Sequence, residues 1–139
     1  MENSFSFEVR IYYDSTDAGG VVYHSKYLDI CERARTEFLR SKGIIQSKLL
    51  KEENIGFVVS KLNIEYKKSA KLDDLLNINT SILENNGLII KMKPEIYLIS
   101  REDIKIDNTL LCSVIVDIVA INTNGKLIRI PKNIIELLK

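Results

Sequence analysis

The first forty residues carry two different hydrophobic periods. Residues 5–13 alternate between apolar and polar side chains, which predicts a β-strand with one apolar face formed by Phe5, Phe7, Val9, Ile11 and Tyr13. From Ser25 to Ser41 the apolar positions recur at steps of four, three and four, which predicts an amphipathic helix with a buried stripe of Tyr27, Cys31, Ala34 and Phe38. Gly43 fits the position just past a helix end, where a left-handed backbone is usual.

The rest of the chain has the patterns of successive strands. Residues 56–66 alternate between apolar and polar side chains, and residues 74–83 continue in the same style. Residues 88–99 predict a long strand in which Pro94 indicates an edge position or a bulge, because proline has no N–H to donate. Residues 109–121 are apolar on both faces, which predicts a central strand covered on both sides.

Tight turns connect these strands and set the expected fold class. The segments 85–87 (NNG) and 122–125 (NTNG) are turn signals, and Pro131 can open a short terminal helix. Successive strands joined by tight turns favour an antiparallel sheet, and a helix of about 16 residues, ~24 Å long, can lie across such a sheet. We therefore expect one domain over residues 1–139, of the α+β class.

Composition and charge narrow the class of protein. Hydrophobic residues make up 45% and charged residues 28% of the 139 residues, the profile of a globular protein. The net charge of +1 gives no overall field that would favour nucleic acid or an acidic membrane surface. Residues 1–5 lack the basic and apolar regions of a signal peptide and no apolar run reaches the length of a membrane span, so we expect neither a signal peptide nor a spanning segment. Cys31 and Cys112 lie far apart in the sequence, so we expect buried thiols and a cytoplasmic location.

A carboxylate beside a glycine pair is the first candidate for chemistry. Asp17 lies just before Gly19 and Gly20, in the loop between the first strand and the long helix. Because glycines carry no side chain, they leave a ligand free to approach this carboxylate. It could act as a nucleophile, or as a general base toward water. The alternative interpretation is that Asp14 or Asp17 only shapes a turn or caps the helix.

The start of the long helix is the second candidate. Its first backbone N–H groups, near Tyr23, His24 and Ser25, have no acceptor within the helix. They could polarise a substrate carbonyl and hold a developing oxyanion, although most helix starts are capped by a side chain or water. His24 is the only histidine, and it could position substrate or water or support Asp17, although a histidine at a helix start is more often structural.

Other arrangements of polar residues are weaker candidates. A metal site formed by Asp14, Asp17 and His24 matches no established spacing of metal ligands, so no metal is expected. The chain contains no G-x-S-x-G sequence and no G-x-x-x-x-G-K-[ST] loop. The basic run 67–71 is either a solvated loop or a contact for the phosphates of a large anionic cofactor, through Lys67, Lys68 and Lys71.

Two blocks of the sequence carry a resemblance to a known family. Residues 12–39 are YYDSTDAGGVVYHSKYLDICERARTEFL, and residues 57–76 are FVVSKLNIEYKKSAKLDDLL. In this order the two blocks resemble the YbgC-type acyl-CoA thioesterases, which belong to the 4-hydroxybenzoyl-CoA thioesterase branch of the hotdog fold. The resemblance extends over nearly the whole chain and is weaker in the C-terminal third.

This resemblance implies a fold, an activity and a site. The fold would be a hotdog, a curled antiparallel β-sheet wrapped around one long central helix. Asp17 would be the catalytic carboxylate and the amide of His24 would polarise the thioester carbonyl, with His24 and Tyr13 bordering the acyl site. The expected substrate-binding residues are Gly19, Gly20, Val21, Val22, Tyr23, Ser25, Lys67, Lys68 and Lys71. No cofactor is expected beyond the coenzyme A of the substrate.

The expected activity is hydrolysis of an acyl thioester of coenzyme A, or of acyl carrier protein, to the free acid and thiol. Family members form dimers and commonly tetramers with active sites at subunit interfaces, so we expect a homotetramer. Some relatives are tied to the Tol–Pal envelope system and to phospholipid metabolism. Two other functions stay open from the residues: a hotdog hydratase or dehydratase acting on acyl thioesters, and a non-catalytic module that binds acyl thioesters or proteins.

Overall fold

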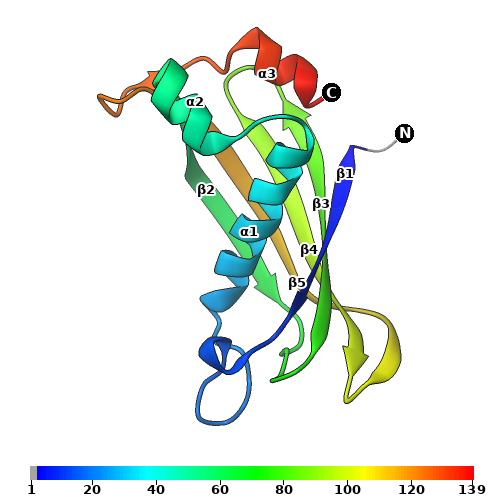
Figure 1. Cartoon of the computed structure of the whole chain (residues 1–139). Coiled ribbons are helices and arrows are strands. Elements are labelled where there is room, and N and C mark those ends of the chain that lie inside the picture. The colour runs from blue at the N-terminus through cyan, green and yellow to red at the C-terminus, as the bar shows by residue number, and fades with distance from the viewer. Residues whose placement is uncertain (1–2) are drawn as a thin grey trace.

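A curled antiparallel sheet is the largest feature of the protein, as a computed structural model of residues 3–139 describes it (Figure 1). No helix in this part of the chain combines the length and the apolar character needed to cross a membrane. In chain order the elements are β1 (Ser4–Arg10), the 3-10 turn η1 (Tyr13–Ser15), α1 (Lys26–Ser41), α2 (Gln46–Glu53), β2 (Gly56–Tyr66), β3 (Leu75–Asn85), β4 (Ile90–Arg101), β5 (Ile104–Ile121), β6 (Leu127–Ile128) and α3 (Lys132–Leu137).

The sheet has the strand order β1-β3-β4-β5-β2, and β6 pairs with the end of β5. Strands β3, β4 and β5 follow one another as antiparallel neighbours. By contrast β2 pairs with β5 and not with β3, the next strand in the chain. Figure 1 shows α1 lying across one face of this sheet. The predicted α+β class, with a curled antiparallel sheet around one long helix, is confirmed.

Helix α1 packs through the stripe that the sequence predicts. Tyr27, Cys31, Ala34 and Phe38 are each at most 3% exposed. Gly43 follows the helix with a φ of +86°, the left-handed conformation that favours glycine. The sheet contributes the other side of the core through the buried side chains of Leu76, Ile78, Ile96, Leu98, Leu111 and Val114. The core therefore lies between α1 and strands β3 to β5, with α1 held against the sheet along its length.

Phe38 is the side chain whose removal we expect to cost the most stability. It is fully buried, and its ring stacks on Phe5 of β1 with centroids 5.6 Å apart. Phe38→Ala should lower the free energy of unfolding by about 3–5 kcal/mol, because a large cavity replaces a packed ring. Urea unfolding at fixed protein concentration measures this loss. Leu137→Ala, at a 44% exposed position, should cost less than about 1 kcal/mol, and equal losses would contradict the described packing.

The first strand is shorter than the sequence predicts. It ends at Arg10, which pairs with Leu75, the first residue of β3, so no partner strand continues beyond that point. Ile11 is still buried, but Tyr13 lies in η1 and is 81% exposed. The prediction that Tyr13 shares the apolar face of the strand is therefore wrong.

Two expectations about the later strands also need correction. Pro94 does not lie on an edge strand, since β4 runs between β3 and β5. The pairing of β4 with β5 is interrupted between Met92 and Glu95, and the register is the same on both sides of this gap. The interruption contains Pro94, which has no N–H to donate. Strand β5 is central in the sheet, as predicted, but its outer face is not fully covered, and Ile115 is 40% exposed.

Candidate active site

A short closed loop carries Asp17 between β1 and α1. Thr16 and Val22 form an isolated antiparallel bridge, and inside it the amide of Asp17 donates to the carbonyl of Val21 at 2.9 Å. The amide of Gly20 donates back to the carbonyl of Asp17 at 3.1 Å. Gly20 has a φ of +81°, which most residues adopt only with strain, so its lack of a side chain lets the loop close. We call residues 16–22 the Asp17 loop.

The carboxylate of Asp17 has one engaged oxygen and one free oxygen. Oδ1 accepts hydrogen bonds from the amides of Gly19 at 2.8 Å and Val21 at 3.3 Å. Oδ2 has no hydrogen-bond partner among residues 3–139, and the side chain is half-buried. A Cβ atom at position 19 would lie 3.3 Å from Oδ1, so Gly19 allows the close approach. The two interpretations of Asp17 are thus compatible, since it shapes the turn and still presents an oxygen.

The start of α1 lies beside the Asp17 loop with free donors. The amide of Tyr23 donates to the carbonyl of Ser15 at 3.2 Å, which places the helix entrance against the residues that precede Asp17. Within the described residues, the amides of His24 and Ser25 have no acceptor, and the Ser25 side chain makes no capping hydrogen bond. Such free donors at a helix N-terminus can hold a developing negative charge on oxygen.

A pocket of about 260 Å³ opens at this helix start. Tyr66, the last residue of β2, donates its hydroxyl hydrogen to the carbonyl of His24 at 2.7 Å, and its ring meets the His24 ring edge-on. Burial raises the pKa of the Tyr66 hydroxyl, which favours its role as a donor. The pocket thus joins the helix start to the basic run, and its lining residues are Val22, His24, Tyr27, Tyr66, Lys67, Lys68 and Ser69.

Sequence reasoning missed Tyr66. The only signal for it was its place at the end of an alternating strand, directly before the basic run. The structure brings it to His24 although 42 residues separate them in the chain. A strand end that meets a helix start is a tertiary event, so no local pattern could have identified this contact.

The remaining predicted site residues do not form one cluster in the structure. Val22 is buried, Val21 half-buried, and Tyr23 is exposed. Lys71 is exposed and its backbone bridges Val21, but it does not line the 260 Å³ pocket. Tyr13 is directed to solvent, and only its carbonyl takes part in the loop, as an acceptor for the amide and hydroxyl of Thr16. In a single chain, therefore, Asp17, Tyr13 and Lys71 do not line this pocket with His24.

Neither cysteine belongs to this site. Both thiols are free and buried, as the sequence predicts. Burial raises the pKa of Cys31 to about 12 and that of Cys112 to about 11. Among residues 3–139, no three histidine, cysteine or acidic side chains lie close enough together to hold a metal ion.

The raised thiol pKa values lead to a prediction about reactivity. At pH 8 the thiolate fractions of Cys31 and Cys112 should be on the order of 10⁻⁴ and 10⁻³, and only thiolates react. The folded protein should therefore not react with Ellman's reagent over minutes, whereas both thiols should react after unfolding in guanidinium. Immediate labelling of either cysteine in the folded protein would contradict this burial.

A cavity of about 390 Å³ lies along α1 on the side of β2. Its lining is mostly apolar and includes Leu28 and Leu39 of α1, Val58 and Leu62 of β2, and Met92 of β4. It includes none of the Asp17 loop residues and not His24. Because three of the lining residues, Val58, Val59 and Leu62, belong to an exposed sheet edge, this cavity is open at the free side of β2.

Known proteins are similar to this chain over nearly all of its length. A model of the thioesterase-like superfamily matches residues 9–138. The acyl-CoA thioester hydrolase YbgC of Escherichia coli O6:H1 is 39% identical over 136 residues, which cover 97% of this chain and 96% of that protein. The acyl-CoA thioesterase YbgC of Haemophilus influenzae is 53% identical over 90 residues, 65% of this chain and 66% of that protein.

Solved structures agree with this relationship. A probable thioesterase from Bartonella henselae is 36% identical, with a TM-score of 0.79 over 92% of this chain and 99% of that chain. A 4-hydroxybenzoyl CoA thioesterase mutant, solved with 4-hydroxybenzoyl CoA, has a TM-score of 0.89 over 99% of both chains, and at 20% identity it supports the fold alone. The chain therefore belongs to the thioesterase-like superfamily, among the YbgC-type thioesterases that the sequence predicts, and it has the hotdog fold.

Proposed function

We propose that this protein hydrolyses acyl-CoA thioesters at the Asp17 loop, with the start of α1 as the oxyanion site. The observation that carries this proposal is the pair of free amides at His24 and Ser25, at a helix start hydrogen-bonded to the segment just before Asp17, whose carboxylate has one unengaged oxygen. The relatives named acyl-CoA thioesterase or thioester hydrolase support the reaction class. None of the relatives compared above is named as a hydratase or dehydratase.

The chemistry needs only these parts. The thioester carbonyl accepts hydrogen bonds from the helix start, which stabilises the negative charge on its oxygen as the carbonyl carbon is attacked. The Asp17 carboxylate either attacks that carbon or removes a proton from an attacking water. The leaving group is a thiol with an ordinary pKa near 8.5, so it departs as a thiolate with little help from a general acid.

We place the phosphates of coenzyme A at the basic run after β2. Lys67 and Lys68 are exposed and line the same pocket as His24. Their ammonium groups can attract phosphate at a distance and bind it as point charges. Lys71 is exposed on the same connection and can add to this field. No cofactor other than the coenzyme A of the substrate enters this reaction.

A panel of acyl-CoA substrates tests the proposal. Release of free thiol is measured for short, medium, long and aromatic acyl groups, and the same reactions are analysed for hydrated products. Thiol release from at least one substrate, at a rate well above the uncatalysed rate, is the expected result. Hydration of an enoyl-CoA without free thiol would favour a hydratase, and tight acyl-CoA binding without turnover would favour a binding module.

We further propose that two copies associate through β2. This strand of 11 residues pairs with β5 on one side only, and an open strand edge can pair with another chain. Val58, Val59 and Leu62 of β2 are 38%, 44% and 38% exposed beside the 390 Å³ cavity. A two-fold axis at this edge would cover the same residues on both subunits. A tetramer built from two such dimers remains the prediction for the full assembly.

Charges at the β2 edge should separate the copies. The double variant Val58→Lys and Leu62→Lys would place like charges in the apolar contact, so it should have the monomer mass at concentrations where the wild type is an oligomer. Light scattering after size exclusion measures the mass. Leu127→Lys is the control, since it replaces an apolar residue by lysine at a 73% exposed position on β6, away from the β2 edge. A double variant that assembles like the wild type would exclude this edge.

We also place the protein in the cytoplasm. The two free and buried thiols support this location, since disulfides form mainly in oxidising compartments. The link to the Tol–Pal system rests on the family resemblance and stays a prediction.

A further inference from the structure

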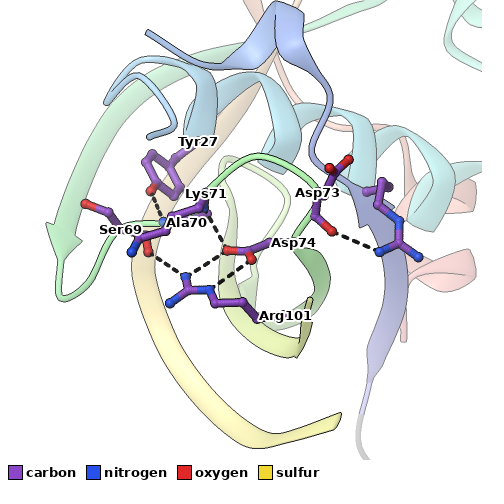
Figure 2. Close-up of polar contacts among 8 residues, drawn as sticks. Tyr27, Ser69, Ala70, Lys71, Asp73, Asp74 and Arg101 are labelled. Carbon is purple, nitrogen blue, oxygen red and sulfur yellow. Dashed lines mark hydrogen bonds and ion pairs between the residues drawn. The ribbon is translucent and has the colours of Figure 1, made fainter. Parts of the chain in front are cut away.

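An ion pair between a buried carboxylate and a half-buried guanidinium lies under the connection between β2 and β3. Asp74 is 1% exposed, and its carboxylate accepts hydrogen bonds from Nε and Nη2 of Arg101 at 3.0 and 2.8 Å. The same carboxylate accepts the amide of Lys71 at 2.7 Å, and Nη2 of Arg101 also donates to the carbonyl of Ser69 at 3.3 Å (Figure 2). Both oxygens of a buried carboxylate are thus engaged, and they fold residues 69–74 into one fixed turn.

This segment, residues 69–74, is hydrogen-bonded to the chain on both sides of Asp17. Before η1, Ile11 exchanges two backbone hydrogen bonds with the segment, one to Asp74 and one from Asp73, both at 2.9 Å. Near the end of the Asp17 loop, Leu72 donates its amide to the carbonyl of Gly20 at 3.0 Å. The segment therefore contacts the chain both before and after Asp17.

Ala70 connects the end of the loop to the start of α1. Its carbonyl accepts the amide of Val22 at 3.0 Å, and its amide donates to the hydroxyl oxygen of Tyr27 at 2.8 Å. Tyr27 lies in the first turn of α1 and is 3% exposed, so its ring cannot shift without disturbing the core. Figure 2 shows the Tyr27 hydroxyl and the Asp74 carboxylate accepting the amides of the neighbouring residues Ala70 and Lys71. One residue therefore sets the spacing between the loop that carries Asp17 and the free amides of the helix start.

From this geometry we infer that Arg101, Asp74 and Tyr27 are positioning residues for thioester hydrolysis. The inference rests on the proposed function. Arg101 and Asp74 fix the turn at residues 69–74, and Tyr27 connects that turn to α1. Together they hold the Asp17 carboxylate and the His24 amide in a fixed position relative to each other. None of the three has to touch the substrate. Misplacement of reacting groups by about 1 Å can cost ~10²-fold in rate, which is the scale on which such a lock acts.

Turnover of Tyr27→Phe and Arg101→Gln gives the first readout. Each variant should lower kcat for thiol release by about tenfold or more while KM changes less than about threefold, because the loss falls on the transition state. Arg101→Lys keeps the charge but not the two-pronged geometry, so it should recover part of kcat. The controls are Tyr97→Phe, which removes a hydroxyl from β4, and Lys91→Gln, which breaks the 3.7 Å ion pair with Asp117. Both controls should retain wild-type kcat.

The second readout separates positioning from a general loss of stability. If Tyr27 acts through the placement of Asp17, then Tyr27→Phe should slow the Asp17→Asn protein by less than about twofold, since the group that it positions is already gone. A tenfold further loss in that background would overturn the inference, as would wild-type kcat in both Tyr27→Phe and Arg101→Gln.

Hydrogen exchange tests the lock without turnover. The amide of Val22 should exchange at least tenfold faster in Tyr27→Phe and Arg101→Gln than in the wild type, and at the wild-type rate in Tyr97→Phe and Lys91→Gln. Unchanged exchange in the first two variants would overturn the lock itself. The two proposals can fail separately. If the wild-type protein releases no thiol, but Val22 still exchanges faster in Tyr27→Phe and Arg101→Gln, the proposed function is overturned and the lock is retained.

Discussion

Asp17→Asn is expected to lower kcat for thiol release from acyl-CoA by about 10²–10⁴. The variant keeps a side-chain oxygen that can accept the amides of Gly19 and Val21, so the turn should persist. It loses the negative charge that would attack the carbonyl carbon or take a proton from water. Because the loop still binds substrate, KM should change much less than kcat. Steady-state kinetics with the best substrate of the panel measures both constants.

Asp14→Asn is the matched control for this result. Asp14 is an exposed carboxylate three residues earlier, in η1, and it accepts the hydroxyl of Ser15 at 3.2 Å. Its variant removes the same charge from the same region and should retain kcat within about twofold. Equal rates for the wild type and Asp17→Asn would remove Asp17 from the mechanism. Equal losses in both variants would point to the local field instead of one catalytic carboxylate.

His24→Pro is the second change with a large expected effect. Proline removes the backbone N–H that we assign to the oxyanion site, and loss of one such donor typically costs about 10²–10³ in kcat. His24→Ala keeps the amide and should lose less than about tenfold, since the imidazole only borders the site. The comparison separates the backbone donor from the side chain, which a single substitution at this position could not do.

Ser25→Pro tests which amide acts. Ser25 has a φ of −74°, which suits proline, and its amide also has no acceptor among the described residues. If the His24 amide is the main donor, Ser25→Pro should cost less than about tenfold. A loss as large as that of His24→Pro would mean that both amides hold the oxygen. Wild-type rates in both proline variants, with helix content and melting temperature retained, would exclude the helix start as the oxyanion site.

The sequence alone determined the elements that depend on local periodicity. The stripe of α1 from Tyr27 to Phe38 is buried as predicted, and the alternating strands are present with shifts of a few residues at their ends. It also placed Asp17, Gly20 and the helix start in one short segment, and family resemblance gave the hotdog fold and thioesterase family that the comparisons confirm. A helical or alternating period encodes which face an element buries, so it can be recognised without knowing the neighbour.

The tertiary structure decided what depends on partners far apart in the chain. Nothing local could show that β2 pairs with β5, that β1 ends where β3 begins, or that β4 is interior despite Pro94. The same holds for Tyr66 at His24 and for the pair formed by Asp74 and Arg101, which lie 27 residues apart. These contacts are directional hydrogen bonds between side chains and backbone groups, and their geometry exists only once the sheet order has fixed which strand ends and loops meet.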